Sequence, residues 1–81
     1  MPKPTHRDLT CSAVARILME ERKRQGLSME RLAEQAGLST SMISLIERDL
    51  RNPTLDTLLR ITDVLRLDLG TVIQDAAKSS K

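Results

Sequence analysis

Apolar side chains recur at helical spacing in five segments of the chain, and capping residues or glycines separate these segments. The first predicted helix starts near Thr10 or Ser12, because either hydroxyl can cap it, and ends at Gly26. Its apolar face consists of Val14, Ile17 and Leu18. The pattern contains no strand-like alternation of useful length, so it predicts an all-α fold.

Two short helices joined by a tight turn follow. Ser28 is placed to cap the second predicted helix, and Gly37 ends it at a turn that needs a positive φ. Ser39 then caps a third helix, predicted from about Thr40 to Glu47. Ala33 has a small side chain, which lets the two helices approach closely.

The third predicted helix has two different faces when its residues are placed on a wheel at about 100° each. One face is polar and consists of Thr40, Ser41, Ser44 and Arg48. The opposite face is apolar and consists of Met42, Ile43 and Ile46. Leu45 lies on the border. A capped helix, a glycine turn and a second helix with a small polar outer face are typical of a helix-turn-helix.

A fourth helix is predicted after Pro53, with Thr54 as its cap, and a short fifth helix after Asp68. The inner face of the fourth helix is predicted to consist of Leu55, Leu58, Ile61 and Leu65. The remaining apolar residues exceed what one short helix can bury beneath itself, which indicates an interface between two copies of the chain. This predicted homodimer interface consists of Val64, Leu67, Leu69, Val72 and Ile73. In the alternative, the fifth helix only closes the core of the monomer.

The length of 81 residues fits one domain, predicted as a compact five-helix bundle over residues 10–77. Residues 1–9 carry two prolines and no periodicity, which predicts a flexible N-terminal arm, and residues 78–81 are predicted to be a polar tail. Such a small domain leaves no room for an enzyme pocket beside a second module.

Composition narrows the function classes further. The net charge of +2 favours nucleic acid only weakly. One cysteine and one histidine cannot build a typical zinc site, and no cofactor or small-molecule ligand is expected. No apolar run approaches a membrane span of about 20 residues, and the start lacks the apolar stretch of a signal peptide. The chain is therefore expected in the cytoplasm, and no catalytic constellation is found.

Four sequence blocks resemble one known family in register. These blocks are GLS at 26–28, LAEQAGLS at 32–39, ISLIER at 43–48 and NPTLDTL at 52–58. They resemble the phage repressor/Cro family, also called the Xre-type helix-turn-helix family. The resemblance extends over roughly residues 14–73, and in size and predicted helix number the chain is similar to restriction–modification controller proteins.

The resemblance implies a lambda-repressor-like bundle that binds double-stranded DNA as a dimer on a near-palindromic operator. The family's base-contacting positions fall on Thr40, Ser41, Ser44 and Leu45, called the recognition face below. Its phosphate contacts fall on Ser28, Met29, Ser39, Arg48, Arg51 and Asn52. Its structural ion pair falls on Arg22 and Glu47, with Ala33 and Gly37 as the helix-packing and turn residues. Each assignment has a simpler alternative. Thr40 and Ser41 are then ordinary polar residues of a first helical turn, and Arg48 and Arg51 are only solvated. Arg22 and Glu47 then form a surface ion pair that contributes little stability.

The chain departs from the family pattern at a few positions. Met29 stands where the family often has glutamine, so a side-chain bond to phosphate is lost there. Asp49 and Arg66 stand at positions where glycine is usual, and Glu21 is polar where many relatives are apolar. Aspartate tolerates the left-handed conformation better than most residues. These departures affect local geometry rather than the fold.

The combined prediction is a transcriptional regulator, with a restriction–modification controller as one form of it. RNA polymerase is a further candidate partner. No binding to a membrane is expected. The alternative is an antitoxin that blocks a partner protein and represses its own operon. A short polar C-terminus disfavours this alternative, because an antitoxin typically wraps its toxin with a longer tail. An enzyme is not expected.

Overall fold

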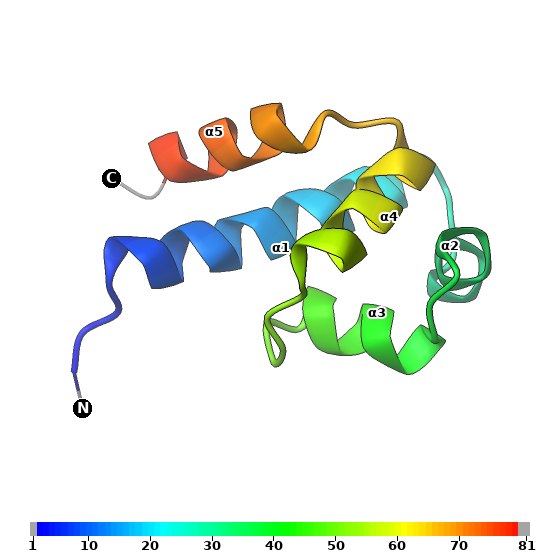
Figure 1. The fold of residues 1–81 in the computed structure, drawn as a ribbon, viewed down its shortest axis with the longest axis horizontal. Helices are drawn as coiled ribbons and strands as arrows, with labels where there is room; N and C mark the ends of the chain where they lie inside the picture. Colours follow the sequence, from blue (N-terminus) through cyan, green and yellow to red (C-terminus); the bar gives the residue numbers. More distant parts are fainter. Residues whose placement is uncertain (1, 80–81) are drawn as a thin grey trace.

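The computed structural model describes residues 2–79, and this range contains five helices and no strand. The helices are α1 (His6–Arg24), α2 (Met29–Ala36), α3 (Thr40–Glu47), α4 (Leu55–Leu65) and α5 (Leu69–Ser79). Helix α1 runs through the middle, with α5 antiparallel to it on one side and α2 to α4 on the other (Figure 1). The all-α five-helix bundle predicted from the sequence is confirmed.

A core of aliphatic side chains joins all five helices. Its buried members are Ala13, Val14, Leu18, Leu32, Ala33, Ile43, Ile46, Ile61, Leu65, Val72 and Ala76. Full burial of one leucine or isoleucine stabilises a fold by about 1.5–3 kcal/mol. Helix α3 contributes Ile43 and Ile46 to this core, so its opposite side is left on the outside of the bundle.

The helix ends follow the predicted capping residues. The predicted N-caps are confirmed by side chains that accept a backbone N–H three residues on: Ser28, Ser39, Thr54 and Asp68. Such a cap stabilises a helix by about 1 kcal/mol. Gly37 ends α2 with a φ of 70°, as expected for the turn.

The first helix begins earlier than predicted, at His6 rather than near Thr10 or Ser12. The reason is a capping box. The Thr5 hydroxyl accepts from the Asp8 N–H at 3.1 Å, and the Asp8 carboxylate accepts from the Thr5 N–H at 3.0 Å. These bonds also lower the pKa of Asp8. Residues 6–9, expected in the arm, are thus helical.

The last helix also runs further than predicted. Lys78 and Ser79, expected in the polar tail, form the end of α5. The rest of the predicted tail, residues 80 and 81, lies outside the described residues. Among residues 2–79, no helix has the length and apolar character needed to cross a membrane.

The inner face of α4 differs from the prediction at two positions. Leu55, expected inside, is 64% exposed because it opens the helix beyond the edge of the core. Thr62, which was not singled out, is buried, and its hydroxyl donates to the carbonyl of Leu58 at 3.0 Å. This bond within the helix lets a polar side chain lie in an apolar core. Ile61 and Leu65 are buried as predicted.

Candidate nucleic-acid interface

Helices α2 and α3 cross steeply at the predicted turn. Figure 1 shows α2 nearly end-on while α3 runs across the view. The turn is closed by a hydrogen bond of 2.9 Å from the Leu38 N–H to the carbonyl of Ala33. Ala33 of α2 is 2% exposed and packs in the core that joins the helices, where a small side chain was expected. The helix-turn-helix arrangement is confirmed.

The recognition face lies on the outer side of α3. Thr40 and Ser41 are exposed, and Ser44 and Leu45 are half-buried. Thr40 and Ser41 stand about one turn before Ser44 and Leu45 on the helix, so the structure brings the four residues together on one surface. Hydroxyl groups donate and accept hydrogen bonds at base edges, and a leucine can contact a thymine methyl.

The predicted phosphate contacts at the two helix starts keep a free donor. The hydroxyls of Ser28 and Ser39 accept from backbone N–H groups at 3.0 Å, which leaves their own protons available for a phosphate oxygen. The N-terminus of a helix also attracts anions through its free N–H groups. Met29 differs, because its side chain packs against the core. Only its backbone N–H, in the first turn of α2, can meet a phosphate.

The loop between α3 and α4 presents the remaining predicted contacts. Arg48, which caps α3, and Arg51 and Asn52 in the loop are all exposed. The ion pairs formed within residues 2–79 do not include Arg48 or Arg51. Both guanidinium groups therefore keep their charge and donors for an outside anion.

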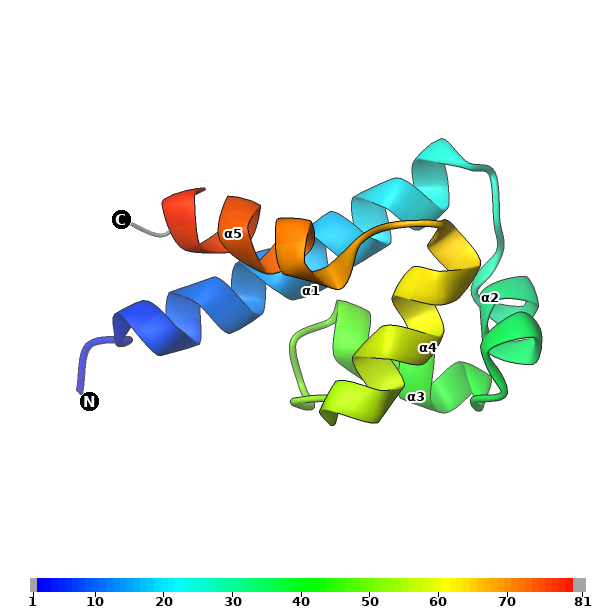
Figure 2. The ribbon, with the colours of Figure 1, turned by 45° about the horizontal axis from the view of Figure 1, so that its top comes forward.

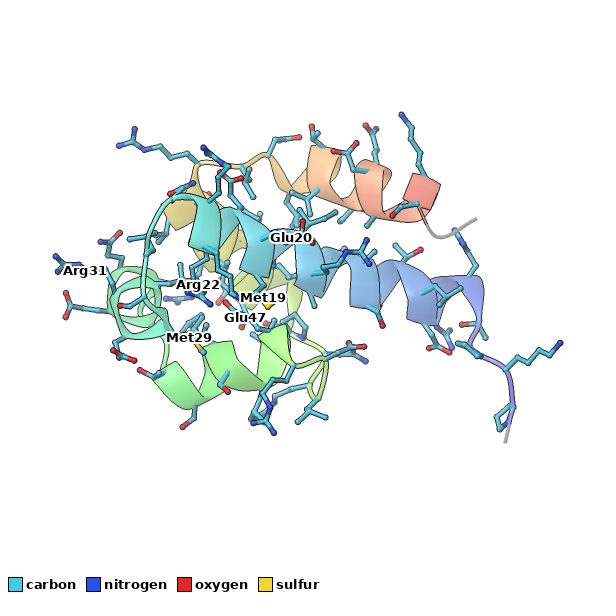
Figure 3. All side chains as sticks on the ribbon, turned by 180° about the vertical axis from the view of Figure 1, so that it is seen from behind. Met19, Glu20, Arg22, Met29, Arg31 and Glu47 are labelled. Carbon is cyan, nitrogen blue, oxygen red and sulfur yellow. The ribbon has the colours of Figure 1, made fainter. Side chains whose placement is uncertain are left out.

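A buried ion pair holds the end of α3 against α1. The guanidinium of Arg22 donates to both carboxylate oxygens of Glu47, at 2.6 and 2.9 Å, and to the carbonyl of Leu27 at 2.7 Å (Figure 3). The side chains of Arg22 and Glu47 are only 9% and 6% exposed. Hydrogen bonding to Glu47 raises the pKa of Arg22. The surface-pair alternative is therefore wrong, because this pair is a bidentate contact inside the protein.

The structure does not bring the predicted dimer residues together. Leu69 and Val72 are 8% and 4% exposed and pack in the core of the protomer, as the monomer alternative expects of them. Val64 of α4 and Leu67 of the loop after it are half-buried and line a hollow together with residues of α1, α2 and the loop between those two helices. Ile73, 41% exposed, lines a separate groove. The five residues therefore do not form one exposed patch.

The groove beside Ile73 is apolar and has a volume of about 200 Å³. Val14 and Leu18 of α1, Pro53 of the loop and Leu58 of α4 line it with Ile73. Further apolar side chains are exposed on α4 and the loop before it: Leu50, Leu55 and Leu59. The sequence pattern did not indicate that these leucines belong to an interface. The i, i+4 spacing of Leu55 and Leu59 was the signal that could have identified a second apolar stripe on α4.

Comparison with known proteins also identifies a helix-turn-helix in this chain. The family model for the helix-turn-helix family (HTH_3) matches residues 18–72. The transcriptional regulator PuuR of Escherichia coli (strain K12) is 39% identical over 66 residues, which cover 82% of this chain and 36% of PuuR. The transcriptional regulator SinR of Bacillus subtilis (strain 168) is 33% identical over 63 residues, or 76% of this chain and 57% of SinR. The chain thus spans between about a third and somewhat more than half of these two relatives.

Several solved structures are also similar to this fold. A mutant of the restriction–modification controller protein C.Esp1396I superposes with a TM-score of 0.76 at 29% identity, covering 85% of this chain and 90% of that one. The biofilm regulator SinR in complex with DNA superposes with a TM-score of 0.70 at 34% identity, covering 74% and 97%. The helix-turn-helix match, the steep α2–α3 crossing and these relatives agree: the chain belongs to the helix-turn-helix family of the Xre type.

Proposed function

We propose that this protein is a transcriptional regulator that binds a near-palindromic duplex DNA site as a homodimer. The observation that carries the proposal is the outer side of α3, which bears small polar side chains while Ile43 and Ile46 hold its inner side in the core. Such a helix can enter the major groove of DNA and present its outer side to the base edges. The SinR complex with DNA supports the proposal through its shared fold.

The phosphate contacts surround the recognition face. The starts of α2 and α3 supply the hydroxyls of Ser28 and Ser39 and the free N–H groups of their first turns. The loop after α3 supplies Arg48 and Arg51. Contacts of this kind set the orientation of the protein on DNA, whereas the recognition face selects the sequence. A face of hydroxyls and one leucine gives modest discrimination, so DNA shape contributes the rest.

A comparison of two variants tests these roles. Arg51→Ala is expected to weaken binding to specific and random DNA alike and to reduce the salt dependence of the logarithm of the binding constant by about 0.9 per protomer. Ser41→Ala is expected to keep the salt dependence. It should change the difference in binding free energy between the preferred base and other bases at the contacted position by roughly 1–3 kcal/mol. Fluorescence anisotropy measures the salt dependence across a salt series and the base preference across DNA sites with substituted bases.

The control variant for charge is Lys78→Ala, because Lys78 lies in the last turn of α5. Figure 1 shows α5 on the other side of α1 from α3. Lys78→Ala should behave like the parent. An unchanged salt dependence for Arg51→Ala would contradict the phosphate contact, and an unchanged base preference for Ser41→Ala would contradict the recognition face.

The homodimer is proposed to form around Ile73 on α5 rather than through all five residues named from the sequence. Ile73 is 41% exposed, although it is a large apolar residue. Two recognition helices, about one helical turn of DNA or roughly 34 Å apart, supply affinity that one helix with small side chains lacks. The likeness to a restriction–modification controller, matched over 90% of its chain, makes that class of regulator the specific form we propose.

Ile73→Asp is expected to convert the dimer into a monomer, because it places a charge in a desolvated contact. Sedimentation equilibrium at micromolar concentration should then give the monomer mass of 9.1 kDa, and DNA affinity should fall more than tenfold. The matched control is Gln74→Asp, which adds the same charge at the next, already exposed position of α5. A monomeric parent that binds DNA with one copy per site would contradict the dimer.

A further inference from the structure

The loop that carries Arg48 and Arg51 begins with a strained backbone. Asp49 has a φ of 58°, a conformation that favours glycine over side chains with a Cβ. The backbone itself closes the turn, because the N–H groups of Asp49 and Leu50 donate to the carbonyls of Ile46 and Leu45 at 3.0 and 2.9 Å. These bonds form the usual end of a helix with a left-handed residue. A glycine would make the same turn with less strain, so the aspartate side chain calls for a separate explanation.

The Asp49 carboxylate is bonded to α1. The hydroxyl of Ser12 donates to its Oδ2 at 2.5 Å, across 37 residues of sequence. Both ribbon views show the loop between α3 and α4 on one side of α1, below the middle of that helix (Figures 1 and 2). Asp49, Arg51 and Pro53 also line the groove whose floor is formed by Val14 and Leu18 of α1. The loop therefore rests on α1, and the Ser12–Asp49 bond joins the two.

The position of this carboxylate also determines where its negative charge lies relative to the proposed phosphate contacts. Asp49 lies between Arg48 and Arg51 in sequence, on a loop proposed to meet phosphates. A carboxylate that faced DNA would repel it, whereas one bonded to Ser12 is held toward α1. The bond thus fixes the loop and keeps the negative charge on the side of α1.

We propose that Ser12 and Asp49 form a latch, the Ser12–Asp49 hydrogen bond, that positions the loop of residues 48–53 for contact with DNA phosphates. The proposal rests on the proposed DNA binding and goes beyond it, because neither residue touches DNA. Ser12 and Asp49 are positioning residues that act through Arg51 and its neighbours.

Two pairs of variants separate the latch from strain and from charge. Ser12→Ala removes the donor, and Ser12→Thr keeps it. Asp49→Gly removes the acceptor but relieves the strain at φ 58°, so it should melt at or above the temperature of the parent. Asp49→Asn removes the same negative charge, keeps an acceptor oxygen and tolerates the left-handed conformation.

The first measurement is amide hydrogen exchange by NMR on the DNA-free protein. Loss of one hydrogen bond is expected to speed the exchange of the Asp49 and Leu50 amides about three- to tenfold in Ser12→Ala. Ser12→Thr should exchange like the parent. Because no DNA is present, this result is independent of the proposed function. Parental exchange rates in Ser12→Ala would overturn the latch.

The second measurement is DNA affinity across a salt series. Ser12→Ala and Asp49→Gly are both expected to bind several-fold more weakly and to lose about 0.9 per protomer from the salt dependence. Ser12→Thr and Asp49→Asn should keep the parental salt dependence. Charge removal alone predicts the reverse for Asp49→Gly, namely tighter binding. Tighter or unchanged binding by Asp49→Gly, with faster loop exchange, would overturn the positioning role. A parent that binds no DNA would defeat the proposed function, and the exchange data would still report on the bond itself.

Discussion

Arg22→Met is expected to lower the free energy of unfolding by about 3–5 kcal/mol, because it leaves the Glu47 carboxylate buried without its charged partner. Arg22 donates to both oxygens of that carboxylate, and the side chain of Glu47 is 6% exposed. Small domains are stable by only about 5–15 kcal/mol in total. The variant should therefore be partly unfolded at moderate temperature, and urea denaturation followed by circular dichroism measures the loss.

The matched control replaces both partners, as Arg22→Met with Glu47→Leu. Two apolar side chains of similar size leave no unpaired charge, so most of the lost stability should return. The double variant also tests whether the pair orients α3, because its DNA affinity can fall while its stability recovers. A single Arg22→Met variant within about 1 kcal/mol of the parent would show that the pair behaves like an exposed one.

Gly37→Val is expected to cost about 2–3 kcal/mol, since it forces a β-branched side chain into a left-handed turn. Gly37 has a φ of 70°, and a Cβ there would lie 3.1 Å from Nη1 of Arg60. In a domain of this size the loss corresponds to a fall in melting temperature of roughly 10–20 °C. Above the lowered melting temperature, DNA binding should be lost with the fold.

Gly26→Val separates strain from crowding. Gly26 has nearly the same φ, 72°, but a Cβ there would meet nothing within 4 Å. Its loss should therefore be smaller than that of Gly37→Val. Calorimetry of both variants gives the difference, and a Gly37→Val protein that melts like the parent would disprove the turn described here.

Local patterns predicted much of this structure. The caps at Ser28 and Ser39, the left-handed Gly37 and the two faces of α3 depend on neighbours within four residues, so the sequence alone is enough to identify them. The start of α1 was missed for a local reason. Two prolines suggested a disordered arm, and the capping box uses Asp8 where glutamate or glutamine is more usual.

Tertiary features were predicted less well, because periodicity shows that a side chain is apolar but not which partner buries it. Leu69 and Val72 looked like surplus apolar surface, yet α5 lies along α1 and places them in the core. Thr62 looked polar, yet its hydroxyl is satisfied within α4. The Ser12–Asp49 bond joins residues too distant in sequence for any local pattern to reveal.

Selection of binding sites from random duplex DNA by the parent protein tests whether a homodimer reads the DNA sequence. We expect one enriched site made of two inverted half-sites, with centres about one helical turn or roughly 34 Å apart. Ser41→Ala should select a site altered at matching positions of both halves. Recovery of no preferred sequence would contradict sequence-specific binding, and recovery of a single half-site without inverted symmetry would contradict the homodimer.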